Sequence, residues 1–150
     1  MSAPADPAFA ERVAAGFAAQ PFMGLLGASL ARVEPGLVEI VLPVRPALGQ
    51  QHGFVHAGAA WSIADSAAGF AAQTLMPPGT GVLTVELKIN LLRPATGVRL
   101  TAVGRVERAG RRITVCRSDV LAEAEDATTR PVAIALGTFT AVPETPATAG

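Results

Sequence analysis

The sequence predicts an α+β fold in which one long helix packs against an antiparallel sheet of about five to six strands, in two layers. An Ala-rich run that ends at Met76 has the length of a helix, and the helix-breaking sequence Pro77-Pro78-Gly79 follows it. Apolar and polar residues then alternate in several successive runs, which is the pattern of strands with one buried face.

The N-terminal third is predicted to hold a short helix and a hairpin. Apolar residues recur every four positions within residues 7–19, which is typical of an amphipathic helix, and Pro21 ends that run. Two strands, residues 25–33 and 37–44, are joined by the turn sequence Glu34-Pro35-Gly36. The long helix comes next, and its small side chains would let a sheet curl closely around it.

Four strands are predicted after the long helix. In the first strand, five apolar residues are expected on one face and the polar residues between them on the other. These apolar residues are Leu83, Val85, Leu87, Ile89 and Leu91. The remaining strands are expected at residues 98–108, 111–121 and 132–141, with an acidic loop at residues 123–126.

The length of 150 residues predicts a single domain, residues 1–150, with its core at about residues 25–141. Residues 1–5 and 143–150 are expected to be loose tails, because they are rich in Pro, Ala, Thr and Gly. Half of the residues are apolar and only 16% are charged. We therefore expect apolar surface to be buried between the subunits of a homo-oligomer, either a dimer or a tetramer.

The overall charge and the single cysteine restrict the class of protein. The net charge is zero, which argues against nucleic-acid binding, because phosphate recognition needs a basic excess. The sequence shows neither a signal peptide nor an uninterrupted apolar run of membrane-spanning length, so we expect no membrane partner. Cys116 has no second cysteine to pair with, which fits a reducing cytoplasm.

Asp65 is the chemical anomaly of the predicted long helix. It is a lone carboxylate among alanine and other apolar residues, where burial would raise its pKa. It could then serve as a general base for water near neutral pH. Alternatively, Asp65 is a structural acid that pairs with an arginine or accepts a hydrogen bond from Ser62 or Ser66.

The start of this helix is a candidate anion site. Residues 55–58 contain no Ser, Thr, Asp or Asn that could cap the first amides. Those amides could therefore form an oxyanion hole, or could be satisfied by water or a loop carbonyl. Asp65 is about two turns too far along the axis to reach them in its own chain. Two helices side by side would bring Asp65 of one subunit to the helix start of the other.

The other polar groups give weaker signals. His52 and His56 lie four residues apart, but the intervening Gly53 and the absence of a third nearby ligand argue against a metal site. His56 is expected to orient the loop or to bind a ligand. Eight basic residues within residues 86–117 could hold a phosphorylated small molecule, or could simply form the outer face of two strands.

Residues 50–65 and the strand with Thr84 resemble the hotdog-fold acyl-CoA thioesterases of the phenylacetic-acid-degradation (PaaI-like) type. That family has an Asn, then His-Gly-Gly six residues later, then an Asp nine residues after the His. His56, Ala57-Gly58 and Asp65 match these positions, whereas Gln50 stands in place of the Asn. Neighbouring Gln51 could also take the Asn role. The resemblance covers about residues 25–141 and implies a long central helix wrapped by a curved antiparallel sheet.

The resemblance implies hydrolysis of an acyl-CoA, with Asp65 as general base or nucleophile. It implies that the Ala57 and Gly58 amides polarise the thioester carbonyl across a dimer interface. Gln50 and His56 would position the reacting groups, and Thr84 would assist Asp65. Coenzyme A would be part of the substrate, so no separate cofactor and no metal is expected. From the basic patch, Arg93, Arg111 and Arg112 are the candidates for binding its phosphates.

Two other functions remain open from the sequence. The departures at Gln50 and Ala57 would suit a non-catalytic acyl-CoA or lipid-binding module on the same fold. An enoyl-CoA hydratase or dehydratase also pairs a His with an acid, although the spacing of His56 and Asp65 fits that class poorly.

Overall fold

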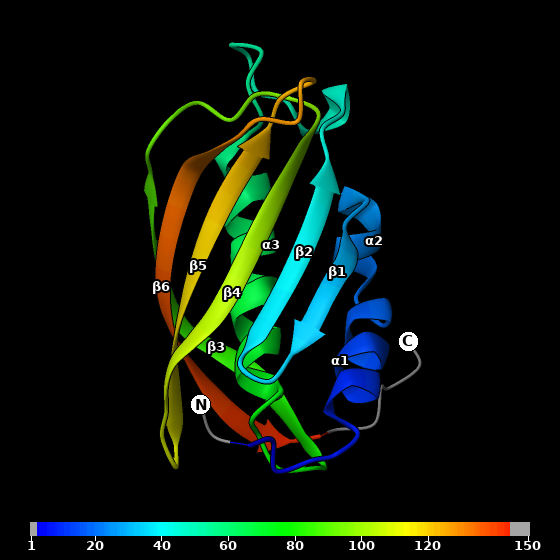
Figure 1. Ribbon diagram of the computed structural model, residues 1–150, viewed down its shortest axis with the longest axis vertical. Coiled ribbons are helices and arrows are strands. Elements are labelled where there is room, and N and C mark those ends of the chain that lie inside the picture. The colour runs from blue at the N-terminus through cyan, green and yellow to red at the C-terminus, as the bar shows by residue number, and fades with distance from the viewer. Residues whose placement is uncertain (1–2, 145–150) are drawn as a thin grey trace.

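The computed structural model describes residues 3–144, and it confirms the predicted α+β fold. The long helix α3 (Ala57–Gln73) is wrapped by one curved antiparallel sheet of six strands (Figure 1). Two short helices, α1 (Phe9–Ala18) and α2 (Pro21–Leu26), lie beside the sheet edge formed by β1, and the 3₁₀ helix η1 (Pro46–Leu48) precedes α3.

The order of the strands places β3 at one edge of the sheet. The order is β1-β2-β4-β5-β6-β3, so the chain crosses from β2 through α3 to the opposite edge before it returns to the centre. Among the described residues, β3 pairs only with β6, which leaves the other edge of β3 free. The strands are β1 (Ser29–Glu34), β2 (Leu37–Pro43), β3 (Thr80–Leu91), β4 (Arg99–Ala109), β5 (Ile113–Glu123) and β6 (Thr129–Pro143).

The prediction of a strand from residue 25 was wrong in its first residues, because residues 21–26 form α2. Pro21 occupies the first helical position, where a missing N–H costs nothing, so it starts a helix as well as following one. Gly27 ends α2 in the left-handed conformation at φ 82°. The amides of Gly27 and Ala28 both donate to the Met23 carbonyl, and β1 begins only at Ser29.

The predicted alternation of β3 is interrupted by a bulge at Val85. Thr84 pairs with Phe139 and Glu86 with Thr138, so Val85 is an extra residue without a partner. The bulge breaks the single apolar face that we predicted. Leu83 and Val85 are exposed, whereas Leu87 and Ile89 pack against the core.

The boundaries of β5 also differ from the prediction. Arg111 and Arg112 belong to the turn between β4 and β5, and the strand begins at Ile113. Glu123, which was predicted to start the acidic loop, is the last residue of β5. The C-terminal tail was predicted to begin at residue 143, which is one residue too early, because Pro143 is the last residue of β6. Residues 1–2 and 145–150 lie outside the described part.

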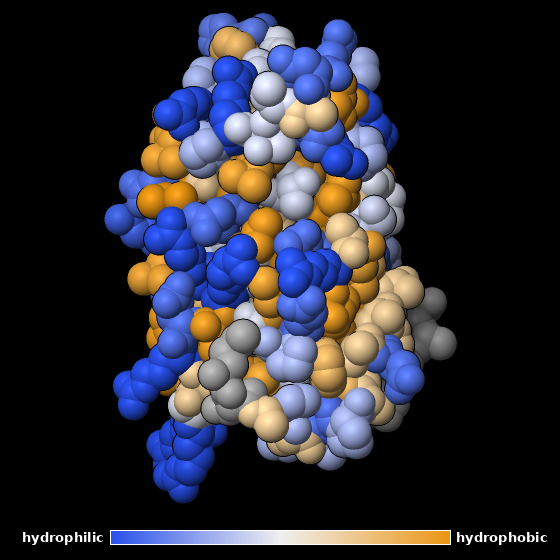
Figure 2. Space-filling model, in the orientation of Figure 1, coloured by the Kyte–Doolittle hydropathy of each residue, from blue (hydrophilic) through white to orange (hydrophobic). Residues whose placement is uncertain are grey.

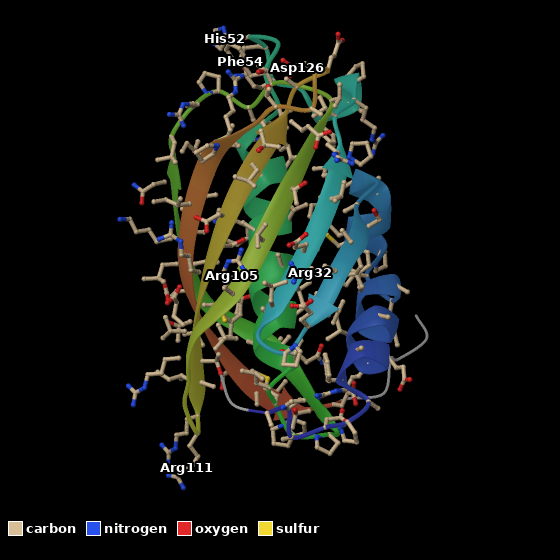
Figure 3. The ribbon with its side chains drawn as sticks, viewed as in Figure 1. Arg32, His52, Phe54, Arg105, Arg111 and Asp126 are labelled. Atoms are coloured by element: carbon tan, nitrogen blue, oxygen red, sulfur yellow. The ribbon has the colours of Figure 1, made fainter. Side chains whose placement is uncertain are left out.

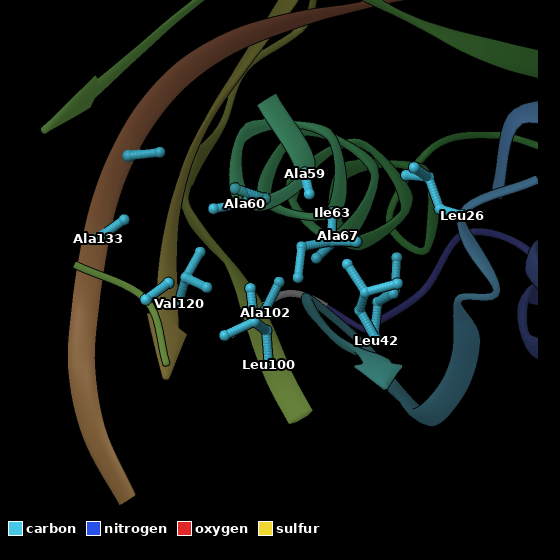
Figure 4. Close-up of a cluster of buried hydrophobic side chains, with 14 of the residues drawn as sticks. Leu26, Leu42, Ala59, Ala60, Ile63, Ala67, Leu100, Ala102, Val120 and Ala133 are labelled. Atoms are coloured by element: carbon cyan, nitrogen blue, oxygen red, sulfur yellow. The ribbon is translucent and has the colours of Figure 1, made fainter. Parts of the chain in front are cut away.

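Small residues of α3 form the centre of the core, as predicted from its composition (Figure 4). Ala64, Ala67 and Ala71 are fully buried against the sheet. A Cβ on Gly104 of β4 would lie 2.3 Å from the backbone of Ala67, so the helix and sheet touch at a pair of minimal side chains. The core also includes Val13 of α1, which lies before the predicted start at residue 25.

The outer face of the sheet is mixed in polarity (Figure 2). Polar side chains gather at the projecting tip of the β4–β5 hairpin, near the lower left of the view. No helix within residues 3–144 has both the length and the apolar character required to cross a membrane.

Candidate functional site

Asp65 and Thr84 meet on the side of α3 that faces the free edge of the sheet. The Thr84 hydroxyl donates to Asp65 Oδ1 at 2.8 Å. This contact depends on the bulge at Val85, because the bulge lets Thr84 face the helix while Leu87 does so further along the same strand. The structure therefore joins two of the predicted site residues from separate elements.

The surroundings of Asp65 raise its pKa above the ordinary value of 3.8. Burial of the carboxyl is the main cause, and the hydrogen bond from Thr84 opposes it in part. The direction agrees with the sequence-based expectation. No arginine pairs with Asp65 among the described residues, and Ser62 donates instead to the Gly58 carbonyl at 2.7 Å. A structural ion pair is thus ruled out for Asp65 within this part of the chain.

The start of α3 is capped by a histidine, although we expected no side-chain cap. His56 Nδ1 accepts a hydrogen bond from the Gly58 amide at 2.8 Å. The Ala57 amide finds no acceptor among the described residues. Ala57 therefore offers the open N–H at this helix start, while the Gly58 N–H is already engaged.

Gln50 lies in the loop that leads into α3, beside the same helix start. Its side-chain oxygen accepts from the His52 amide, and its backbone N–H donates to the Phe54 carbonyl at 2.8 Å. Gln50 also lines a cavity of about 350 Å³ together with Ala57 and Arg93. In contrast, Gln51 is an exposed residue of the turn.

The three candidate phosphate-binding arginines do not lie together in one chain. Arg93 is in the cavity at the helix start, where its guanidinium donates to the Pro131 carbonyl at 2.7 Å. Arg111 lies at the opposite end of the molecule from His52 of the helix-start loop (Figure 3). Arg112 is next to Arg111 in the same turn.

The predicted site residues thus form two groups within one chain. Asp65 and Thr84 make one group, and the residues around the helix start make the other. Asp65 is eight residues after Ala57, which corresponds to about 12 Å along the helix axis. The second group consists of Gln50, His56, Ala57, Gly58 and Arg93.

Two hollows adjoin Asp65 that the sequence did not predict. A cavity of about 370 Å³ lies between α2 and α3, and one of about 70 Å³ lies towards Thr84. Asp65, Ser66 and Gln20 line both. The start of α2 could have been found from Pro21 followed by Gly27, since that order marks helix ends. The packing of α2 beside Asp65, in contrast, could not be predicted from the sequence.

No group of three His, Cys, Asp or Glu side chains in the described range is arranged to hold a metal ion. The two histidines are both near the helix start, but only His56 makes a side-chain hydrogen bond there.

Comparisons with known proteins identify the family of this chain. Residues 52–128 match the family model of the thioesterase superfamily. A thioesterase family protein from Silicibacter pomeroyi is 41% identical, with a TM-score of 0.88 over 91% of this chain and 99% of that one. A relative from Halobacterium salinarum, whose name assigns esterase activity provisionally, is 31% identical over 77% of this chain and 79% of its own length.

The PaaI protein of the E. coli phenylacetic acid degradation operon shares the fold. Its TM-score is 0.79 over 91% of this chain and 95% of that one, at 20% identity. The chain therefore belongs to the thioesterase superfamily, and its fold is the hotdog fold of the PaaI type.

Proposed function

We propose that this protein hydrolyses an acyl-CoA thioester to the free acid and coenzyme A. The observation that carries this proposal is the half-buried Asp65, with its raised pKa and its single hydrogen bond from Thr84. Such a carboxylate is a stronger base than an exposed one, and it still has one oxygen available for water or substrate.

In the proposed reaction Asp65 removes a proton from water as the water oxygen attacks the thioester carbonyl carbon. The C–S bond then breaks, and the coenzyme A thiolate leaves and takes up a proton. Direct attack by Asp65 is the other route, through an anhydride that water then hydrolyses. Negative charge develops on the carbonyl oxygen in both routes, and the Ala57 amide at the positive end of α3 is suited to stabilise it.

The 12 Å separation supports a site shared by two subunits. Asp65 and Thr84 of one subunit would face the Ala57 amide and Gln50 of the other. The cavity with Arg93 would then hold coenzyme A near the same helix start. Arg111 and Arg112 lie at the far end of their own chain, so an antiparallel partner is the arrangement that would bring them towards this cavity. A dimer or a dimer of dimers provides it.

The test is thiol release from acetyl-, hexanoyl- and phenylacetyl-CoA by wild type and Asp65→Asn. Asparagine keeps the shape of the aspartate side chain and can accept the hydrogen bond from the Thr84 hydroxyl, but it cannot act as a base. We expect kcat to fall about 10²- to 10⁴-fold, which is the usual contribution of general acid–base catalysis. Asp119→Asn is the control, because Asp119 pairs with Arg117 on the surface and is outside the site. Full activity of Asp65→Asn would show that the assigned base is wrong.

A second function, acyl-CoA binding without hydrolysis, is favoured by two contacts. The Gly58 amide is engaged by His56, and the Gln50 side chain bonds within its own loop. The His56 ring and the Gln50 side chain would have to turn before the Gly58 amide and Gln50 could contact a thioester carbonyl. Saturable binding of hexanoyl-CoA by calorimetry, with no thiol release from any of the three substrates, would select this function.

A further inference from the structure

We propose that the cavity between α2 and α3 is the acyl subsite of the enzyme, and that it accepts an uncharged apolar acyl group that packs against Phe22 and Trp61. The inference rests on the proposed thioesterase function and adds the class of substrate to it. No residue of α2 was assigned a role by the sequence.

The cavity adjoins the proposed catalytic base, because Asp65 lies in its wall. A carboxylate that activates water for attack on the carbonyl carbon must lie within one water molecule of that carbon. The acyl chain begins at the same carbon, so its first atoms must pass beside Asp65. The cavity is the larger of the two hollows there, at about 370 Å³.

The smaller hollow has room for water. Its volume of about 70 Å³ compares with about 30 Å³ for one water molecule in the liquid. Thr84, Gln20 and Ser66 supply polar groups there, next to the carboxylate. Asp65 therefore stands between a polar hollow that suits the attacking water and a wider one that suits the acyl group.

Much of the lining of the larger cavity is apolar. Pro21, Phe22 and Met23 come from α2, and Trp61 comes from α3 one turn before Asp65. Phe22 and Trp61 are 52% and 39% exposed, although large apolar side chains are usually covered. An apolar acyl group between them would remove that surface from water.

The same carboxylate disfavours acyl groups that carry a negative charge. The described residues lining the cavity include no Lys or Arg that could pair with a second carboxylate. A dicarboxylic acyl group such as succinyl would place its charge close to Asp65 in a partly buried space, which is unfavourable. The expected substrates are medium-chain or aryl acyl-CoAs, and a substrate panel separates these two sources of the same apolar chemistry.

The experiment measures kcat/KM for acetyl-, hexanoyl-, phenylacetyl- and succinyl-CoA. We expect the wild-type kcat/KM for hexanoyl- or phenylacetyl-CoA to exceed that for succinyl-CoA by at least about 100-fold. The reason is that each methylene bound in an apolar pocket raises kcat/KM about tenfold or more. Trp61→Ala and Phe22→Ala should lower the ratio of the hexanoyl to the acetyl value at least about tenfold. Ala19→Phe, which narrows the cavity from a surface position, should lower the same ratio without removing any contact.

Leu25→Ala is the matched control. Leu25 is also an exposed apolar residue of α2, but it does not line the cavity, so the ratio should stay at the wild-type value. If the ratio is unchanged in all three cavity variants, the proposed subsite is wrong. If Asp65→Asn has lost hydrolysis in the same experiments, the proposed thioesterase function still holds. Failure of wild type to release thiol from any of the four substrates would overturn both proposals.

Trp61 provides a second measurement, because it is the only tryptophan in the chain. In the slow variant Asp65→Asn, hexanoyl-CoA should shift the tryptophan emission to shorter wavelength, whereas coenzyme A alone should not. Binding of hexanoyl-CoA by calorimetry with no change in emission would contradict the subsite. A change in sedimentation of Phe22→Ala and Trp61→Ala, with no change in selectivity, would instead assign this surface to contact between copies of the chain.

Discussion

At the scale of single residues, Asp65 gains its reactivity from two opposing contacts. Burial favours its neutral form, and the Thr84 hydroxyl favours its charged form by donating to Oδ1. The first effect is the larger, so the pKa is raised. The carboxylate is consequently more basic than an exposed one, and catalysis that requires the ionised form should increase with pH as Asp65 loses its proton.

Thr84→Val is expected to move the acidic limb of the kcat profile to higher pH. The variant removes the contact that lowers the Asp65 pKa, so deprotonation requires a higher pH than in wild type. Thr80→Val is the control, because the Thr80 hydroxyl donates to the Pro77 carbonyl and has no contact with Asp65. A profile for Thr84→Val that coincides with wild type would contradict this account of the pKa.

Ala57→Pro tests the open amide with little disturbance of α3. Proline is well tolerated at the first helical position, and the preceding His56 already has the extended conformation that proline requires, with ψ 137°. We expect kcat to fall about 10²- to 10³-fold, as for loss of one oxyanion donor. The helix content by circular dichroism should remain unchanged. Retained kcat would exclude the Ala57 amide as the donor.

At the scale of elements, α1 is held to the end of α3 by one arginine. The Arg12 guanidinium donates to the carbonyls of Gln73, Met76, Pro77 and Thr80, and it pairs with Asp6 at 3.0 Å. Both side chains of the ion pair are about one-tenth exposed. These contacts tie α1 to the last residue of α3, to the segment that follows it and to the first residue of β3.

Arg12→Met is expected to lower the free energy of unfolding by about 3–5 kcal/mol. The change leaves the Asp6 carboxylate buried without its partner and removes four carbonyl contacts. Urea denaturation followed by circular dichroism would measure the loss. Arg32→Met is the control, because the Arg32 pair with Glu34 is about half exposed and should have little effect on the midpoint. Equal midpoints for the two variants would show that Arg12 does not anchor α1.

At the scale of the whole molecule, the free edge of β3 is the surface that best suits the second subunit of the proposed shared site. β3 carries Thr84 inward and exposes Leu83 and Val85, which are 57% and 60% accessible. An exposed apolar edge strand is a template for pairing with another strand. Antiparallel pairing of two β3 edges would join the sheets and set Asp65 of one chain near the helix start of the other.

Val85→Lys is expected to weaken the dimer and to lower activity with it. A charged side chain on a strand edge opposes edge-to-edge pairing. Sedimentation velocity would report a shift towards the monomer, while Leu136→Lys, at a similarly exposed position on the outer face of the sheet, would keep the wild-type state. A fully active monomer would rule out the shared site.

Mixed dimers test the shared site directly. Subunits with Asp65→Asn and subunits with Ala57→Pro are each expected to be nearly inactive. After joint unfolding and refolding, about half of the dimers would contain one of each, and each such dimer would hold one complete site if the site spans two chains. Recovery of about a quarter of wild-type activity is therefore expected, whereas a site within one chain would give no recovery.

The α+β class, the long Ala-rich helix and the apolar sequence neighbours of Asp65 could be predicted without the structure. These features depend on local periodicity and composition, which every segment carries independently of its neighbours. The local patterns did not predict the contact of Thr84 with Asp65, which only the family resemblance implied, because that contact needs the Val85 bulge and the pairing of β3 with β6. Neither the patterns nor the resemblance predicted that α2 forms a wall of the cavity beside Asp65. A bulge and the packing of a helix depend on contacts between residues far apart in the chain, and the period of one segment does not specify them.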